Sequence, residues 1–192
     1  MKRAIIIHGT DGTPESNWFP WLKAKLEGQG YDVWVPELPG NHTPNRQVYN
    51  DFLLSSGWDF MDNIVVGHSS GAVEVLNLLM DDRCPRIRLG VMVGAWAGME
   101  NADTERMKAA GLDPEQFKYT FPPEGFDFEL IKSKADRLAF VHGDDDPYCP
   151  LEQAEYLAEK LEAEITIVPK GHHLGTRFTE LPELWNLIES EL

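Results

Sequence analysis

The sequence GHSSG at residues 67–71 constrains this chain more than any other stretch. It follows the apolar run 64–66 and precedes residues 72–80, whose apolar positions recur at helical spacing, so the five residues are predicted to form a strand-to-helix turn. A serine on such a turn projects its hydroxyl beyond the edge of a sheet. The crowded backbone requires positions without side-chain bulk two residues before and two after the serine, and Gly67 and Gly71 meet that requirement.

The predicted turn supplies a nucleophile and part of an anion-binding site. N–H groups at the start of the following helix point back toward the turn, so that of Ser70 can bind the oxyanion that forms when Ser69 attacks a carbonyl. The alternative is a glycine-rich turn before an ordinary helix, because G-x-S-x-G arises by chance in roughly one chain of this length in twenty. The rest of the sequence has to decide between the two.

The length and net charge of the chain limit its number of domains and the partners that it can bind. A chain of 192 residues is long enough for one substantial core and too short for two ordinary domains, so one domain over 1–192 is expected. The net charge of −15, with no cluster of Lys or Arg, argues against nucleic acid or an anionic membrane surface as a partner. The only apolar run near the start is 4–7, which is too short for a signal peptide or a membrane span, and a cytoplasmic location is expected.

Six short apolar runs, each followed by turn residues, alternate with longer amphipathic stretches. This is the rhythm of a parallel sheet covered by helices on both faces. We predict a three-layer α/β fold with a six-stranded parallel sheet of order 2-1-3-4-5-6, in which the first and third strands lie side by side where open α/β sheets place their sites. The predicted strands are residues 4–7, 32–35, 63–66, 89–93, 138–141 and 164–168.

The glycine-rich loop after the first strand lies beside the turn in this topology. A backbone N–H of Thr10 or Asp11 can therefore supply a second oxyanion donor, although a plain strand-to-helix turn is the alternative. Two tryptophans are candidates to line a substrate pocket, Trp18 and Trp96, although such residues more often pack in a core. The aromatic-rich excursion 96–128 is predicted either to form a small lid over the site or to pack as an irregular crossover.

Acids and histidines follow the last two predicted strands. A carboxylate at the end of the fifth strand can orient a histidine, but the sequence leaves Asp144, Asp145 and Asp146 open for that role. These acids could instead cap the helix that follows them or bind a cation, although the spacing lacks the pattern of a calcium loop. A histidine in the loop after the sixth strand can reach the serine as its general base, and the loop contains His172 and His173.

The order Ser, Asp, His, each just past a predicted strand, resembles that of the α/β hydrolases. The acid turn 146–150, the Gly-His loop at 171–173 and the N-terminal segments 6–9 and 18–22 extend the resemblance to the small serine hydrolases of the YdeN and retinoblastoma-binding-protein-nine family. That resemblance implies that Asp146 is the acid and that His172, directly after the glycine, is the base. His173 stands where relatives often carry an aromatic residue, and Cys149 replaces the usual valine of the acid turn.

The chemistry implied is attack by Ser69 on a small-molecule ester, thioester or amide, with an acyl-enzyme released by water. Such a reaction needs neither a metal nor an organic cofactor. Cys84 and Cys149 lack metal-type spacing and are expected to be free thiols. A non-catalytic binding protein on the same scaffold is the alternative function, because a fold does not by itself imply an activity.

Overall fold

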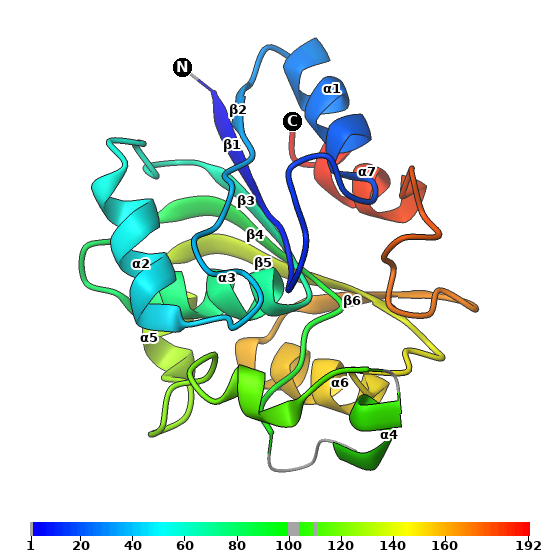
Figure 1. The fold of residues 1–192 in the computed structure, drawn as a ribbon. Helices are drawn as coiled ribbons and strands as arrows, with labels where there is room; N and C mark the ends of the chain where they lie inside the picture. The colour runs from blue at the N-terminus through cyan, green and yellow to red at the C-terminus, as the bar shows by residue number, and fades with distance from the viewer. Residues whose placement is uncertain (1, 100–103, 110) are drawn as a thin grey trace.

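The computed structural model describes residues 2–99, 104–109 and 111–192 (Figure 1). Its centre is a six-stranded sheet of order β2-β1-β3-β4-β5-β6, in which the neighbouring strands are parallel. The predicted sheet and its strand order are therefore confirmed. The strands are β1 (Arg3–Ile7), β2 (Asp32–Trp34), β3 (Ile64–His68), β4 (Ile87–Val93), β5 (Ala135–Gly143) and β6 (Glu164–Val168).

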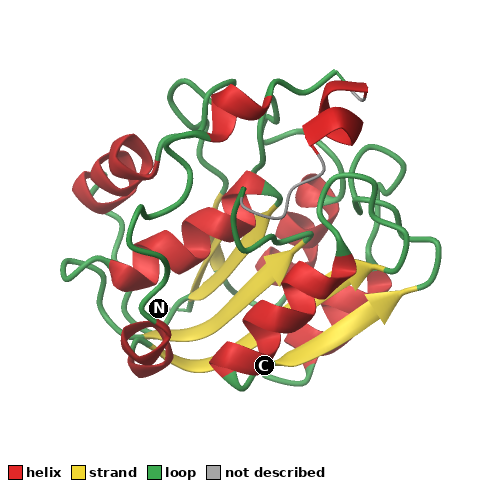
Figure 2. Ribbon diagram, turned by 90° about the horizontal axis from the view of Figure 1, so that it is seen from below, coloured by secondary structure: helices red, strands yellow, loops and turns green. Residues whose placement is uncertain are grey.

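Helices cover both faces of the sheet (Figures 1 and 2). Two of them, α1 (Phe19–Gly28) and α7 (Pro182–Glu189), pack on one face. The opposite face is covered by α2 (Arg46–Ser55), α3 (Ser70–Met80), α5 (Phe128–Ser133) and α6 (Leu151–Leu161). Two short helices, α4 (Thr104–Ala109) and the 3-10 helix η1 (Pro114–Phe117), lie in the long connection between β4 and α5.

The sequence of β1 shows why these strands read as unbroken apolar runs. Ala4 and Ile6 pack in the core under α1 and α7, whereas Ile5 and Ile7 pack in the core under the helices of the other face. All four side chains are fully buried. A strand in the middle layer of three buries both of its faces, so it has no polar alternation.

The long connection between β4 and α5 folds back on itself around aromatic side chains. Trp96 packs edge-to-face against Phe117 and Phe121, with ring centroids 5.0 Å apart in each pair, and Met107 and Cys149 belong to the same buried cluster. The predicted lid 96–128 includes residues 100–103 and 110, which lie outside the described residues. Packing of the described part is clear, and movement of this segment over the site stays a prediction.

The parallel arrangement brings the loops that carry the predicted chemistry to one edge of the sheet. The carboxyl ends of β1, β3, β5 and β6 lead into the loops that contain Thr10, Ser69, Asp146 and the histidine pair. Within the described ranges, no helix has the length and apolar character needed to span a membrane.

Glu74 is a buried acid on α3 that belongs to the core rather than to this edge. Only 1% of the residue is exposed, Oε2 accepts a hydrogen bond from Asn77 Nδ2 at 3.4 Å, and burial raises the pKa of the carboxyl well above its usual value. The folded carboxyl therefore stays protonated to a higher pH than the unfolded carboxyl, which ionises near pH 4.5. The stability that this difference gives is present below pH 4.5 and is lost as the pH rises toward the folded pKa.

We expect Glu74→Gln to remove this pH dependence, because glutamine resembles the protonated acid and cannot ionise. Denaturant unfolding at about pH 5 and about pH 8 measures the free energy of unfolding of both proteins. The value for the variant minus the value for the native protein should be larger at about pH 8 than at about pH 5. Glu15→Gln, which changes an exposed acid, is the control and should leave the two curves parallel. Parallel curves for Glu74→Gln would mean that this carboxyl is ionised in the fold.

Candidate active site

Ser69 occupies a strained turn between β3 and α3. Its backbone has φ 58° and ψ −122°, a combination that L-residues rarely adopt. A Cβ at Gly67 would lie 2.1 Å from the carbonyl oxygen of Gly71, and a Cβ at Gly71 would lie 2.3 Å from the carbonyl oxygen of Ile7. Both contacts are impossible, so the requirement for two glycines that the sequence predicted is confirmed.

A histidine from the loop after β6 meets this serine. Nε2 of His173 lies 2.9 Å from Oγ of Ser69, and Nδ1 of the same ring lies 2.7 Å from Oδ2 of Asp146. Because an ionised carboxylate only accepts hydrogen bonds, Nδ1 carries the ring proton and donates a hydrogen bond to Asp146. Nε2 is then free to accept from the Ser69 hydroxyl. We call these three residues the Ser-His-Asp chain.

Asp146 is held firmly at the end of β5. Only 6% of the residue is exposed, and Oδ1 accepts the N–H groups of Tyr148 and Cys149 at 2.8 and 2.9 Å. Burial by itself would raise the pKa of this carboxyl, but His173 and the two backbone N–H groups outweigh burial and lower it. The carboxylate is thus ionised and aimed at the histidine.

The expectation that His172 faces Ser69 is wrong. His172 turns toward Asp145 instead: its N–H donates to Oδ1 at 2.7 Å, and its ring Nδ1 lies 3.1 Å from Oδ2. His172 lies at the rim of the site with an intermediate exposure. The role that the family resemblance gave to the histidine directly after the glycine therefore falls on the next residue.

The backbone of the histidine loop explains the difference. Lys170, His172 and Leu174 all have φ between 47° and 56°, so the loop is tightly turned rather than extended. Gly171 is needed for close approach to β5, because its Cβ would lie 3.0 Å from Cα of Gly143. The glycine thus packs the loop against the sheet and does not serve to turn the following side chain inward.

Two buried aromatic residues anchor this loop. Nε2 of His68 lies 2.8 Å from the carbonyl oxygen of His173, and the indole N–H of Trp18 donates to the carbonyl oxygen of Leu174 at 2.9 Å. Burial lowers the pKa of His68 to about 3, so its ring is neutral and Nε2 donates. Trp18 is fully buried and does not line the cavity, so its predicted role as a pocket wall is wrong.

The three oxyanion donors predicted from the sequence differ in their hydrogen-bond surroundings. Ser70 is the first residue of α3, where backbone N–H groups have no acceptor within the helix. Thr10 lies against it, with its hydroxyl donating to Oγ of Ser70 at 3.0 Å. The N–H of Asp11, in contrast, donates to the carbonyl oxygen of Asn41 at 3.3 Å, and this engagement argues against Asp11 as a donor to a bound oxyanion.

A buried histidine fixes the loop that carries Thr10. The N–H of Leu38 donates to Nε2 of His8 at 3.0 Å, so the ring proton resides on Nδ1, which donates to the carbonyl oxygen of Gly9 at 2.9 Å. Gly9 approaches the serine so closely that a Cβ there would lie 2.8 Å from Cβ of Ser69. The loop after β1 is thus pressed against the nucleophile.

A cavity of about 440 Å³ opens over Ser69 and His173. Trp96 lines it, as predicted, together with Met107, Leu112 and Phe117 from the long connection after β4. Residues that follow the histidine loop, from Gly175 to Phe178 and including Arg177, also line it. The hydroxyl is therefore accessible to a small molecule.

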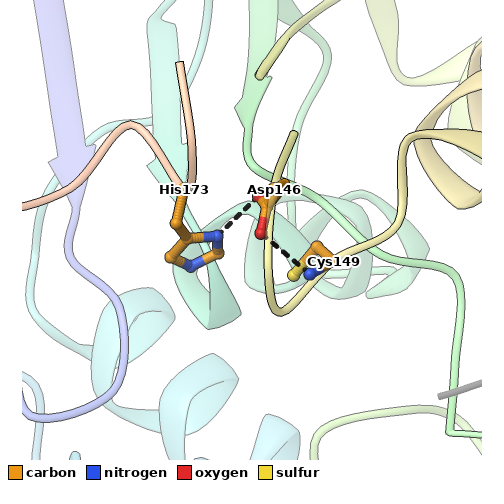
Figure 3. A group of neighbouring side chains, drawn as sticks. All are labelled: Asp146, Cys149 and His173. Carbon is orange, nitrogen blue, oxygen red and sulfur yellow. Dashed lines mark hydrogen bonds and ion pairs between the residues drawn. The ribbon is translucent and has the colours of Figure 1, made fainter. Parts of the chain in front are cut away.

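The side chains around Asp146 include three types that can bind a metal ion. One ligand atom each from Asp146, Cys149 and His173 lies within 4.8 Å of the others (Figure 3). Cys149 and Cys84 are both buried free thiols. The Ser-His-Asp chain already uses two of these three groups.

The parallel sheet of order 2-1-3-4-5-6, with a serine on a tight turn after its third strand, defines the α/β hydrolases. Within that class, a sequence profile of the serine hydrolase family matches residues 4–190, and the chain belongs to this family. The resemblance stated from the sequence is thereby confirmed.

Individual relatives cover nearly the whole chain. The protein YdeN of Bacillus subtilis is 27% identical over 192 residues, which span 98% of this chain and 95% of YdeN. The serine hydrolase RBBP9 of Rattus norvegicus is 22% identical over 183 residues, which span 93% and 91% of the two chains. The crystal structure of the B. subtilis ydeN gene product covers 100% of this chain and 98% of its own, with a TM-score of 0.81 and 23% identity.

Proposed function

We propose that this serine hydrolase cleaves a carboxylic ester through an acyl-enzyme. Ser69 is the nucleophile, His173 is the general base and acid, and Asp146 orients the histidine. The observation that carries the proposal is the Ser-His-Asp chain itself, with contacts of 2.9 and 2.7 Å made by a serine whose strained backbone holds its hydroxyl outside the sheet.

His173 first takes a proton from Ser69 and then gives it to the leaving group. As Ser69 attacks the carbonyl carbon, Nε2 of His173 takes its proton, and the resulting imidazolium is stabilised by the ionised Asp146. The imidazolium then protonates the leaving oxygen, so the alcohol departs and the acyl group stays on Ser69. A water molecule, deprotonated by the same Nε2, releases the acid and restores the serine. These steps require only groups of this chain and water.

The oxyanion of each tetrahedral intermediate needs donors on the side of the serine away from the histidine. We assign this role to the backbone N–H groups of Ser70 and Thr10. The positive end of α3 adds to the attraction, because the N–H groups of its first turn face the site. Removing one such donor typically costs about 10²–10³ in turnover.

The walls of the cavity orient the substrate. Because His173 must protonate the leaving oxygen, the alcohol lies on the side of the histidine loop, near Arg177. The acyl group then faces Trp96, Met107 and Phe117, an apolar wall suited to a short hydrocarbon chain. We favour esters over amides because an alkoxide leaves with less protonation than an amine, and thioesters and amides are the other substrates of the same chemistry.

A fluorophosphonate probe tests the proposal directly. It should label Ser69, as mapped by mass spectrometry, because only a serine paired with a base and facing oxyanion donors is nucleophilic at neutral pH. Ser69→Ala should abolish labelling and hydrolysis of acyl esters of graded chain length. Ser70→Ala is the matched control and should still be labelled, since it keeps its backbone N–H.

Different results lead to different conclusions. Label on Ser70, or label that survives Ser69→Ala, would overturn the assignment of the nucleophile. Labelling without ester turnover would point to amide or thioester substrates. Absence of both labelling and turnover would favour a binding protein built on the hydrolase scaffold.

A further inference from the structure

Cys149 places a soft ligand beside the Ser-His-Asp chain. Figure 3 shows the Asp146 carboxylate between the His173 ring and Cys149, and one ligand atom from each of the three residues lies within 4.8 Å of the others. Cys149 and His173 both line the cavity over Ser69, and Asp146 lies buried behind them. A thiolate, an imidazole and a carboxylate form a donor set that Zn²⁺ binds in proteins.

We propose that Asp146, Cys149 and His173 form an inhibitory site for Zn²⁺ and similar soft divalent cations. This regulation rests on the proposed function of Ser69, but the binding itself does not. The ion takes Oδ2 of Asp146, Sγ of Cys149 and Nδ1 of His173, with water in a fourth, tetrahedral position.

The charge of the site favours such an ion. Asp146 supplies a carboxylate in a buried setting. Binding of Zn²⁺ forms the zinc–sulfur bond and releases the thiol proton of Cys149 to solvent, so the sum of charges becomes zero.

Geometry requires a small adjustment of the histidine. Zinc bonds of about 2.0 Å to oxygen and nitrogen place those two atoms about 3.3 Å apart at the tetrahedral angle. Nδ1 of His173 and Oδ2 of Asp146 are now 2.7 Å apart, so they must separate by about 0.6 Å. The ring lines the cavity and lies between Tyr148 and His68, whose ring centroids are each 5.0 Å from its own, so the movement is along the cavity wall.

Inhibition follows from the position of the ring proton. Metal on Nδ1 leaves the neutral imidazole with its proton on Nε2, the atom that faces Oγ of Ser69. A protonated Nε2 donates to the serine and cannot accept its proton. The same ion therefore removes the base and separates the histidine from its orienting acid.

Cobalt and zinc titrations of the reduced, metal-free protein test the site. Co²⁺ should produce the near-ultraviolet charge-transfer absorption of a cobalt–thiolate bond, and Zn²⁺ should abolish that absorption. Zn²⁺ should also inhibit ester turnover and fluorophosphonate labelling, and a chelator should reverse both effects. Mg²⁺, which prefers oxygen ligands, should not inhibit.

Two cysteine variants decide whether the sulfur is a ligand. Cys149→Ala should lose the cobalt–thiolate absorption and weaken zinc binding by at least about tenfold, because loss of even an outer partner costs that much. Cys84→Ala, which removes the other buried thiol, should behave as the native protein. A cobalt–thiolate absorption that survives in Cys149→Ala would overturn the proposal.

Other outcomes separate this inference from the proposed function. Equal zinc inhibition of the native protein and Cys149→Ala would place the ion elsewhere, for example on the His172 and Asp145 pair, and would also overturn the site. Absence of both absorption and inhibition would do the same. If the protein proves to have no hydrolytic activity, the cobalt absorption and its loss in Cys149→Ala still test binding.

Discussion

Replacing His173 with alanine is expected to lower ester turnover by on the order of 10⁴- to 10⁶-fold and to abolish fluorophosphonate labelling. The serine hydroxyl is a poor nucleophile without a base, and Nε2 of His173 is the nitrogen that lies 2.9 Å from it. The loss should appear in kcat rather than in KM. Circular dichroism and thermal unfolding check that the variant is folded.

His172→Ala is the matched control, since it removes the adjacent ring and leaves the Ser-His-Asp chain intact. It should keep labelling and most of the turnover, with an effect on KM because His172 lines the cavity. Added imidazole should restore part of the activity of His173→Ala and none of that of Ser69→Ala. If His172→Ala is instead the inactive variant, the loop must be turned the other way in solution.

Most of the fold could be predicted because it follows from local patterns. The six apolar runs marked the six strands, and the rule for right-handed crossovers then placed the first and third strands together, as the pairing of β1 with β3 shows. Gly67 and Gly71 marked the turn at Ser69 because only glycine fits contacts of 2.1 and 2.3 Å with neighbouring carbonyls.

The choice between the two histidines could not be read from the sequence, because it depends on three left-handed residues in one loop. Neither Lys170 nor Leu174 is a residue type that signals positive φ. The run of three aspartates held a clue: Asp144 and Asp145 accept the N–H groups of Lys170 and His172, each at 2.7 Å, so each of the three acids has a partner in the histidine loop. The order of the three acids matches the order of their partners, but the pairing skips Gly171, so matching the two segments residue by residue would have pointed to His172.

The anchoring roles of Trp18 and His68 were also out of reach of pattern analysis. Both side chains bond to backbone carbonyls more than 100 residues away along the chain, and such contacts leave no periodic signal. Trp18 resembles a pocket residue because it follows the glycine-rich loop. In the fold it faces the core, where its N–H fixes the carbonyl of Leu174 and thereby the position of His173.

Asp146→Asn should reduce turnover by about 10⁴-fold, the effect that the equivalent change has in serine proteases. The asparagine Oδ1 can still accept the N–H groups of Tyr148 and Cys149, so the turn is preserved. Its amide group then faces Nδ1 of His173 and donates to it. That contact forces the ring proton onto Nε2, where it blocks acceptance of the Ser69 proton.

Asp144→Asn and Asp145→Asn are controls matched in chemistry and position. Each acid accepts one backbone N–H of the histidine loop through Oδ1, and an asparagine oxygen can accept the same bond. Both variants should therefore keep most of the turnover, measured with folding checked by thermal unfolding. Equal losses at all three positions would show that the acids act together by holding the loop, and that the carboxylate of Asp146 has no separate role in setting the proton of His173.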